Sequence, residues 1–229
     1  HPAPVQISWI GYPGTTGIEA MDYILMENTV LPGKNINAQF TEKIIRIPRS
    51  YAFDVEEQLP DVTEAPCVNN NFITFGSFNR LNKINREVIA LWCEVLRKLP
   101  DSRLQMAGMP SDGAPDELLT WFKEGDISED RLYFYPRSGF VEYLKLHNQV
   151  DFCLDTFPYT GGTTTMHALW MGVPTLTLIG DTYPSAQGGA VNNRAGLSQY
   201  FIADSQAEFV AKALFLAENK DILKNMKYS

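Results

Sequence analysis

The residues best suited to chemistry lie in a glycine- and threonine-rich segment between two apolar runs. Residues 150–154 (VDFCL) predict a buried strand that ends at Asp155, and residues 175–179 (TLTLI) predict a second strand. Between them, glycines at 161–162 precede threonines at 163–165. The threonines stand where a helix would begin and where their hydroxyl groups could cap its first turn.

The predicted helix start favours a phosphate group for electrostatic reasons. The first turn of a helix exposes unpaired N–H groups and carries about half a positive charge. The glycines allow a ligand to approach the backbone closely, and the threonine hydroxyls add hydrogen-bond donors. The segment therefore predicts a phosphate or pyrophosphate site. The alternative is a tight strand-to-helix turn with ordinary threonine caps.

Two cations, Arg80 and Lys83, follow another predicted strand at residues 72–78. Parallel strands would bring this loop to the same sheet edge as the glycine-threonine segment. At an effective dielectric of ~20, opposite charges ~4 Å apart attract by ~4 kcal/mol before desolvation. Lys83 could therefore neutralise a departing pyrophosphate. The alternative is a helix-capping loop whose charges are solvated.

Three further side chains each have a functional and a structural interpretation. Tyr143 could stack on a base, although packing beneath the sheet is the default for an aromatic ring. His167 lies off the apolar face of its predicted helix and could reach a sugar hydroxyl or simply face solvent. Arg137 is interpreted as a surface charge.

Strands and helices alternate along the chain, which predicts an α/β fold with a doubly wound parallel sheet. Ligands of such sheets bind at the carboxyl ends of the strands. Four loops, at residues 79–85, 109–114, 136–140 and 157–165, are expected there. Strands are predicted at residues 5–10, 42–48, 72–78, 102–108, 131–135, 150–154, 175–179 and 200–203, and helices at 86–99, 115–123, 139–147, 166–173, 193–199 and 205–226.

The composition disfavours several classes of protein. An apolar content of 45% and an aromatic content of 12% argue for a buried core and against disorder. The net charge of −8 disfavours a general nucleic-acid or acidic-membrane surface, and no apolar run approaches the ~20 residues of a membrane span. The histidines lack metal-ligand spacing, so no metal site is expected. Three cysteines in apolar contexts favour a reducing, cytoplasmic location; these are Cys67, Cys93 and Cys153.

The sequence divides near Ala65. Residues 54–71 are acidic, contain prolines and show no periodicity, so they are interpreted as a linker. Before them, a second glycine-threonine loop at residues 11–17 follows the strand predicted at 5–10. Because the sequence opens almost directly on that strand, we expect it to be a piece of a longer protein.

Three ordered motifs carry a resemblance to a known family. They are WIGYPGTTG at residues 9–17, SFNRLNKI at 77–84 and CLDTFPYTGGTTTMHALWMGVPTLTL at 153–178. Together they resemble the O-GlcNAc transferase/SPINDLY family of nucleotide-sugar-dependent protein O-glycosyltransferases. The resemblance runs from Pro2 to about Leu197. Bacterial members look closest, since the chain lacks the long insertion that animal enzymes carry between their two halves.

The resemblance implies a GT-B architecture, in which the nucleotide-sugar lies between two Rossmann-like domains. Residues 1–64 would then form the C-terminal part of the first, acceptor-side domain. Residues 66–229 would form the second, nucleotide-sugar-binding domain. The resemblance also implies tetratricopeptide repeats upstream and catalytic histidines upstream of Pro2, so no general base is assigned within this chain.

The resemblance further implies roles for individual residues. Lys83 falls on the family's pyrophosphate-neutralising lysine and is the catalytic residue expected in this chain. Arg80 falls where the animal enzyme has a glutamine that contacts phosphate. Gly11, with Tyr12 beside it, matches the loop that lines the sugar pocket. The other residues expected to bind the nucleotide-sugar are Ser138, Tyr143, Gly162, Thr163, Thr164 and His167.

Several positions depart from the animal pattern. Gly162 stands where the animal enzyme has a histidine, and His167 where it has an aspartate. Tyr143 replaces a histidine that lies against uracil, and Phe140 replaces a lysine that contacts ribose. The segment FPYTGGTTT also resembles SPINDLY, whose plant members resemble users of GDP-fucose. The identities of the base and the sugar therefore stay open.

The expected function is that of a metal-independent inverting glycosyltransferase. Its donor would be UDP-GlcNAc, with no other cofactor, and its acceptor would be a serine or threonine hydroxyl of a protein or peptide. The first alternative is a GDP-fucose-dependent protein O-fucosyltransferase. Others are a sugar-nucleotide epimerase and a non-catalytic nucleotide-binding or interaction module. No nucleic-acid or membrane partner is expected.

Overall fold

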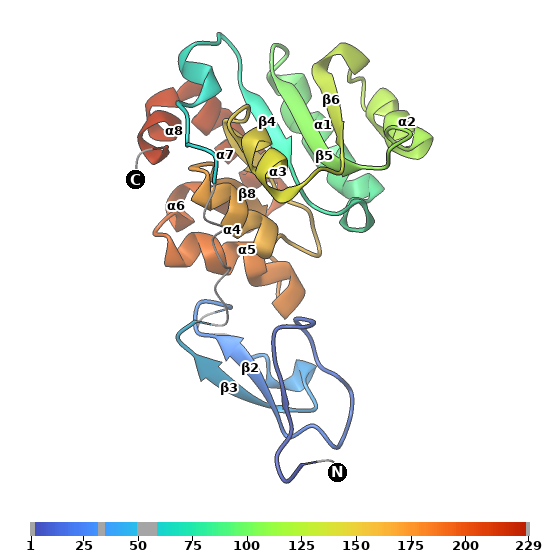
Figure 1. The fold of residues 1–229 in the computed structure, drawn as a ribbon, viewed down its shortest axis with the longest axis vertical. Coiled ribbons are helices and arrows are strands. Elements are labelled where there is room, and N and C mark those ends of the chain that lie inside the picture. Colours follow the sequence, from blue (N-terminus) through green and yellow to red (C-terminus); the bar gives the residue numbers. More distant parts are fainter. Residues whose placement is uncertain (1–2, 32–34, 50–58, 228–229) are drawn as a thin grey trace.

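The computed structural model describes residues 3–31, 35–49 and 59–227, and their strands form two parallel sheets (Figure 1). The smaller sheet has the order β1-β2-β3, and the larger has the order β6-β5-β4-β7-β8-β9. Each strand pairing in the described ranges is parallel, which confirms the predicted sheet type. The strands are β1 Ile7–Ser8, β2 Tyr23–Glu27, β3 Lys43–Ile47, β4 Thr74–Ser77, β5 Arg103–Met109, β6 Leu132–Pro136, β7 Phe152–Leu154, β8 Thr175–Leu178 and β9 Ile202–Ala203.

Helices cover both faces of the larger sheet, as a doubly wound fold requires. On β7, Phe152 and Leu154 pack into the cluster that holds the buried face of α1, whereas Cys153 packs with residues of α3 and α4. Because successive strand residues point to opposite faces, the two clusters lie on opposite sides of the sheet. The α-helices are α1 Arg86–Lys98, α2 Asp116–Glu124, α3 Phe140–His147, α4 Thr163–Trp170, α5 Tyr183–Arg194, α6 Ser198–Phe201, α7 Gln206–Glu218 and α8 Lys220–Met226.

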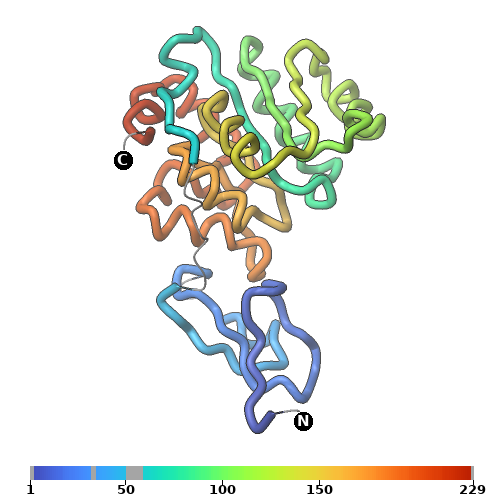
Figure 2. The backbone as a smooth tube through the Cα atoms, viewed as in Figure 1, coloured from blue at the N-terminus to red at the C-terminus, as the bar shows by residue number. Residues whose placement is uncertain are grey.

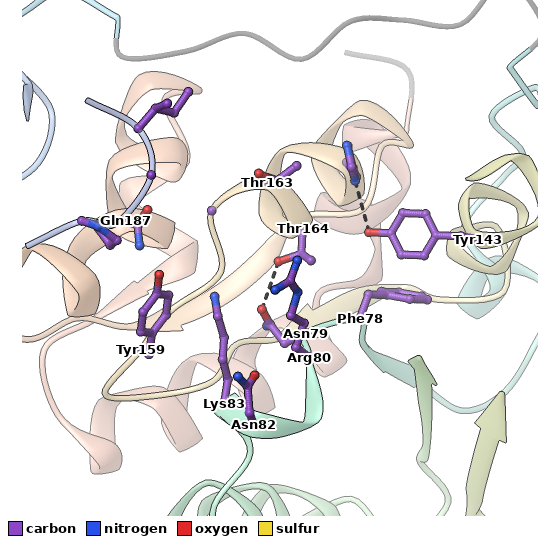
Figure 3. A pocket seen from close by; sticks show the side chains of 15 residues that line it. Phe78, Asn79, Arg80, Asn82, Lys83, Tyr143, Tyr159, Thr163, Thr164 and Gln187 are labelled. Atoms are coloured by element: carbon purple, nitrogen blue, oxygen red, sulfur yellow. Dashed lines mark hydrogen bonds between the residues drawn. The ribbon is translucent and has the colours of Figure 1, made fainter. Parts of the chain in front are cut away.

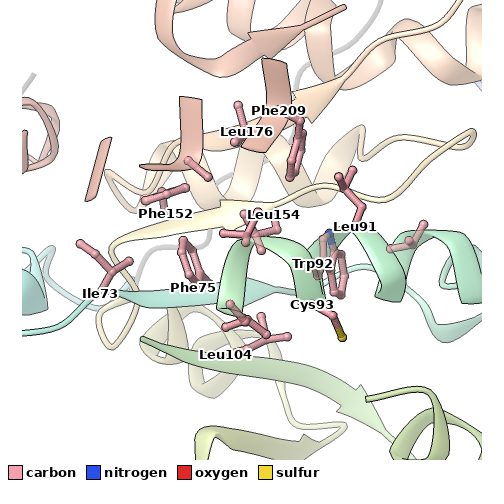
Figure 4. Packing of buried hydrophobic residues seen from close by; sticks show 14 of the residues in the cluster. Ile73, Phe75, Leu91, Trp92, Cys93, Leu104, Phe152, Leu154, Leu176 and Phe209 are labelled. Carbon is pink, nitrogen blue, oxygen red and sulfur yellow. The ribbon is translucent and has the colours of Figure 1, made fainter. Parts of the chain in front are cut away.

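The main core lies between the larger sheet and α1 (Figure 4). Asn85 caps this helix by accepting a hydrogen bond from the N–H of Val88, and Glu87 adds favourable negative charge to the first turn. Trp92 is fully buried against the sheet, and its indole N–H donates to the carbonyl of Asp155 at 3.3 Å. The core thus reaches the residue that immediately follows β7.

The prediction of a helix at residues 193–199 is wrong. The chain instead forms the longer α5, followed by the short α6. Thr182 and Ser185 form a capping box at the start of α5, and Pro184 occupies its first turn, where proline is tolerated. Adjacent glycines at 188–189 weaken the helical signal. Glycine is nevertheless required at position 188, because a Cβ there would collide with Asp155 and Thr177.

Two other segments differ from expectation in extent. The single helix predicted at residues 205–226 is two helices, α7 and α8, which are separated at Asn219 by a non-helical backbone conformation.

Of the predicted linker at residues 54–71, residues 54–58 lie outside the described residues. The rest packs on the larger sheet's unit, where Ala65 is fully buried and the N–H of Thr63 donates to Asn148 at 3.1 Å. The boundary near Ala65 and the domains 1–64 and 66–229 stay predictions.

The smaller sheet packs against α5, at one end of the molecule (Figure 2). Buried side chains from β2 and the segment after it meet α5 residues in one apolar cluster; they are Met26, Val30, Leu31 and Ile36 on one side and Tyr183, Ala186 and Ala190 on the other. Beside the cluster, Arg194 of α5 forms an ion pair with the buried Glu27 at 2.6 Å. The interface therefore combines apolar packing with a charged contact.

Candidate functional site

A cavity of about 680 Å³ lies between the loop after β4, the start of α4 and the loop after β1 (Figure 3). All of the site residues predicted from the sequence line it, other than Tyr12 and Ser138. The lining residues are Ile10, Gly11, Pro13, Phe78, Asn79, Arg80, Asn82, Lys83, Tyr143, Tyr159, Gly162, Thr163, Thr164, His167 and Gln187. The structure thus brings together candidates from three distant parts of the sequence.

The loop between β7 and α4 forms the floor of the cavity. Asp155 follows β7 and is fully buried. Its Oδ1 accepts hydrogen bonds from the N–H of Gly161 at 2.8 Å and from the side-chain amide of Asn79 at 3.1 Å. A Cβ at Gly161 would collide with the hydroxyls of Thr164 and Thr165, so glycine is required for this close approach.

The start of α4 differs from the predicted capping arrangement. The N-cap is Gly162, and no side-chain hydrogen bond caps the helix. Thr163 is the first helical residue and is exposed, whereas the Thr164 hydroxyl donates to Oδ1 of Asn79 at 3.0 Å. Because no threonine occupies the N-cap position, the prediction of threonine caps is wrong. The first-turn N–H groups and their partial positive charge still border the cavity.

Lys83 ends a short 3₁₀ segment, η3 (Leu81–Lys83), and its side chain enters the cavity. Its ammonium group donates to the carbonyl of Thr160 at 2.8 Å and lies 4.0 Å from the ring centroid of Tyr159. Burial lowers the pKa of Lys83, and the charge of Asp155 opposes that shift. No described carboxylate forms an ion pair with this lysine, so its charge is available to an anion in the cavity.

Arg80 lies at the N-cap of η3, is exposed, and points from the same loop toward the start of α4 (Figure 3). It also borders a neighbouring cavity with Arg137, which is exposed as predicted. Two cations and a helix N-terminus therefore face one space in a chain whose net charge is −8. This is the electrostatic arrangement that binds phosphate groups.

Aromatic and imidazole rings form the end of the cavity near α3. Tyr143 both lines the cavity and packs edge-on against Phe78, with ring centroids 5.7 Å apart. Its hydroxyl lies 3.4 Å from Nδ1 of His167, which also lines the cavity. Burial lowers the pKa of His167, which favours a neutral ring at pH 7. The packing of Tyr143 is therefore observed, whereas its stacking on a base stays a prediction.

The smaller sheet contributes the opposite wall through the loop after β1. Ile10 has a left-handed backbone with φ 61°, which is unusual for a β-branched residue. Glu42 anchors the loop by accepting hydrogen bonds from the Thr15 hydroxyl at 2.7 Å and from the Thr16 N–H at 2.6 Å. These bonds lower the pKa of Glu42 to about 2, although burial acts in the opposite direction.

Two predicted residues do not line the cavity. Tyr12 is 60% exposed, and its ring lies 6.4 Å from that of Tyr159. Ser138 is exposed on the loop after β6. Binding roles for both remain predictions. Sequence reasoning missed Asn79, Tyr159 and Gln187, although the position of Asn79 directly after a strand was an available signal.

Residues 3–31, 35–49 and 59–227 contain neither a candidate metal site nor a candidate membrane-spanning helix. The His, Cys, Asp and Glu side chains there form no group of three or more that could hold a metal ion. In the same ranges no helix is long and apolar enough to cross a membrane.

Comparison with known proteins places these features in context. The sequence pattern of glycosyl transferase family 41 matches residues 1–71 and 63–229. A "Probable UDP-N-acetylglucosamine--peptide N-acetylglucosaminyltransferase SPINDLY" from Hordeum vulgare is 34% identical over 233 residues, covering 100% of this chain and 24% of the relative. The corresponding SEC protein of Arabidopsis thaliana is 30% identical, covering 98% and 24%. The chain thus spans about a quarter of these relatives' length.

A solved structure supports the same assignment. The chain resembles a Thermobaculum terrenum O-GlcNAc transferase mutant, with a TM-score of 0.86 and 32% identity. The match covers 99% of this chain and 43% of that one. The expected GT-B-type fold is therefore confirmed.

Proposed function

The chain belongs to glycosyl transferase family 41, and we propose that it forms the donor-binding part of an inverting protein O-glycosyltransferase. The observation that carries this proposal is the convergence of Lys83, Arg80 and the first turn of α4 on one cavity. A nucleoside diphosphate is the group in a nucleotide-sugar that such a cavity would hold. The relatives named as UDP-GlcNAc-dependent peptide transferases support UDP-GlcNAc as the donor.

The proposed reaction is a single displacement at the anomeric carbon of the donor sugar. A serine or threonine hydroxyl of the acceptor protein attacks this carbon, its proton passes to a base, and the bond to the diphosphate breaks. The departing diphosphate takes the bonding electron pair. Lys83 and the N–H groups of α4 would stabilise the charge that develops there, and removal of one such donor typically lowers kcat by about 10²–10³-fold. We assign no general base among the residues of this chain.

A second donor deserves the same test. Tyr143, Gly162 and His167 depart from the animal pattern, and all three line the cavity. The departures therefore lie on the surfaces that would contact the donor. Together with the SPINDLY-like segment FPYTGGTTT at residues 157–165, they support a GDP-fucose-dependent protein O-fucosyltransferase as the second candidate. No specific observation favours a sugar-nucleotide epimerase or a non-catalytic module.

The same proposal covers the acceptor, the rest of the protein and its location. The protein acceptor is inferred from the names of the relatives, and tetratricopeptide repeats in the rest of the protein from the family resemblance. The thiols of Cys67, Cys93 and Cys153 are free and buried, which is compatible with a cytoplasmic location. No cofactor besides the donor is proposed.

Sugar transfer by the full-length protein tests the proposal. Radiolabelled UDP-GlcNAc and GDP-fucose would be offered in parallel with a peptide library that contains serine and threonine. We expect one donor to label hydroxyl-bearing peptides, and labelling from GDP-fucose alone would select the second candidate. Labelling from neither donor would overturn the proposed function.

A chelator tests the metal-independent mechanism separately. Because Lys83 and the α4 N–H groups are proposed to balance the leaving group's charge, transfer should persist in EDTA within about twofold of its untreated rate. Loss of transfer in EDTA, restored by added Mg²⁺ or Mn²⁺, would contradict this mechanism while leaving the transferase assignment intact.

A further inference from the structure

Asp155 is a buried carboxylate beneath the cavity, and it accepts hydrogen bonds from four donor groups. Besides Gly161 and Asn79, its Oδ1 accepts the N–H of Thr156 at 2.9 Å. Its Oδ2 accepts the hydroxyl of Thr177 at 2.8 Å. Hydrogen bonds of this kind favour the ionised form of a carboxyl group.

The carboxylate also orients the wall of the cavity. The amide nitrogen of Asn79 donates to Asp155, so the amide oxygen of Asn79 faces the start of α4. That oxygen accepts the Thr164 hydroxyl at 3.0 Å. One buried group therefore aligns the loop after β4, the loop before α4 and a side chain in the first turn of α4.

The surrounding backbone encloses Asp155 closely. A Cβ at Gly161 would stand 3.2 Å from Oδ1, and one at Gly188 would collide with Oδ2. The absence of a side chain at Gly161 and at Gly188 therefore leaves space for the carboxylate. Such a tight polar site restricts the conformations of the loops that it joins.

One peptide unit joins Lys83 to Asp155, because its Thr160 carbonyl accepts a hydrogen bond from the Lys83 ammonium at 2.8 Å and its Gly161 N–H donates to Oδ1 of Asp155 at 2.8 Å. At this separation the two opposite charges stabilise each other. Burial raises the pKa of Asp155, while hydrogen bonds from Gly161 and Thr177 and the charge of Lys83 oppose the rise. Burial lowers the pKa of Lys83, and Asp155 is the principal influence that raises it. The negative charge beneath the cavity thus favours a protonated lysine within it.

We propose that Asp155 is a positioning residue, which aligns the cavity wall through Gly161 and Asn79 and keeps Lys83 charged for the departing diphosphate. This inference rests on the proposed function, because only there does Lys83 act on a diphosphate.

The substitution Asp155→Asn removes the negative charge of this side chain and keeps nearly the same shape. Asparagine retains an oxygen for the three N–H donors and turns an amide toward Thr177, whose hydroxyl oxygen can accept it. The measurement is kcat/KM for sugar transfer by the full-length protein against pH, which reports groups of the free enzyme. Without the neighbouring charge, Lys83 should lose its proton at lower pH. We expect kcat/KM of the variant to fall about tenfold further than the wild type between pH 7 and pH 9.

Asp151→Asn is the matched control. Asp151 immediately precedes β7, at the end opposite Asp155, is also buried, and accepts the N–H groups of Cys67 at 2.7 Å and Thr74 at 2.8 Å. Neither Cys67 nor Thr74 lines the cavity, whereas Asn79, a partner of Asp155, does. This variant should lose stability without changing the alkaline fall. Parallel pH profiles for Asp155→Asn and wild type would overturn the proposal, as would an equal alkaline fall in both variants.

Two further measurements test the role of Asp155 if the wild type is inactive or if the variant does not fold. If the wild type transfers no sugar, the proposed function fails, and UDP and GDP affinities at pH 7 and pH 9 replace kcat/KM for judging Asp155. If Asp155→Asn does not fold, carboxyl ¹³C NMR of the wild type decides. A carboxylate at pH 7 supports the inference, and a carboxylic acid overturns it.

Discussion

The two walls of the cavity are built in different ways. On the larger sheet, buried groups hold the wall: Asp155 is fully buried and Asn79 is 6% exposed. On the smaller sheet, one buried carboxylate, Glu42, anchors a loop whose lining residue Ile10 is 57% exposed. The two sheets meet through α5. The phosphate-binding wall is therefore held within one unit, whereas the position of the opposite wall depends on how the two units pack.

The largest effect is expected from Lys83→Ala. Losing a charged donor should weaken UDP binding by about 10- to 100-fold while changing uridine binding little, because hydrogen bonds to charged groups contribute ~1.5–3 kcal/mol. Calorimetric titration with both ligands measures the difference. Lys98→Ala, an exposed lysine in the last turn of α1, is the control and should leave both affinities unchanged. Equal losses for UDP and uridine would rule out the phosphate role.

Arg194→Met tests whether the packing of the two units is separable from phosphate binding. It removes the ion pair between Arg194 and the buried Glu27, which should lower the free energy of unfolding by about 2 kcal/mol. UDP affinity should change by less than about threefold. Urea denaturation and calorimetry provide the two readouts.

Arg86→Met is a matched control for that variant. The Arg86–Glu124 ion pair has the same 2.6 Å separation, but its side chains are 70% and 48% exposed. Its loss should change the free energy of unfolding by less than about 1 kcal/mol. If Arg194→Met weakened UDP binding as much as Lys83→Ala, the distinction between the two walls would fail.

Acid should weaken the anchor of the smaller sheet's loop. The pKa of Glu42 is about 2 in the folded protein, below its ordinary value of 4.5. Its stabilising contribution is therefore fully present above pH 4.5 and is lost as pH falls toward 2. Between pH 6 and pH 3, wild type should lose about 1 kcal/mol more unfolding free energy than Glu42→Gln, as measured by urea denaturation. Identical losses would remove Glu42 as the anchor.

The smallest effect is expected from Thr163→Val. The Thr163 hydroxyl is exposed and does not cap α4, so its loss should weaken UDP binding by no more than about fivefold. Thr164→Val is the comparison, because it also removes the bond to Asn79. Parallel UDP titrations measure both, and a larger loss in Thr163→Val than in Lys83→Ala would contradict the assigned order of contributions.

Local patterns in the sequence were sufficient to predict much of the larger sheet's unit. The helix predicted at residues 86–99 is observed as Arg86–Lys98, because its apolar spacing, its Asn85 cap and its burial all agree. Ligands of parallel sheets bind at the carboxyl ends of the strands, and this rule predicted that the cations at 80 and 83 lie near the start of α4.

The failures have a common physical origin in contacts between distant residues. Helix α5 was missed because its glycines lower helix propensity, yet Gly188 is needed where the helix passes Asp155. Trp170 fits the apolar spacing of α4 but is 49% exposed, whereas Ala168 is buried. The role of Asp155 depends on partners as far away as Asn79, which no local pattern reveals.

Calorimetric titration of the full-length protein with UDP and GDP, side by side, shows whether the cavity binds a nucleoside diphosphate. We expect that at least one nucleoside diphosphate binds and that the corresponding nucleoside binds far more weakly. Preference for UDP would support UDP-GlcNAc as the donor, and preference for GDP would support the fucosyl alternative. Binding of neither diphosphate would contradict the claim that Lys83 and the start of α4 form a diphosphate site.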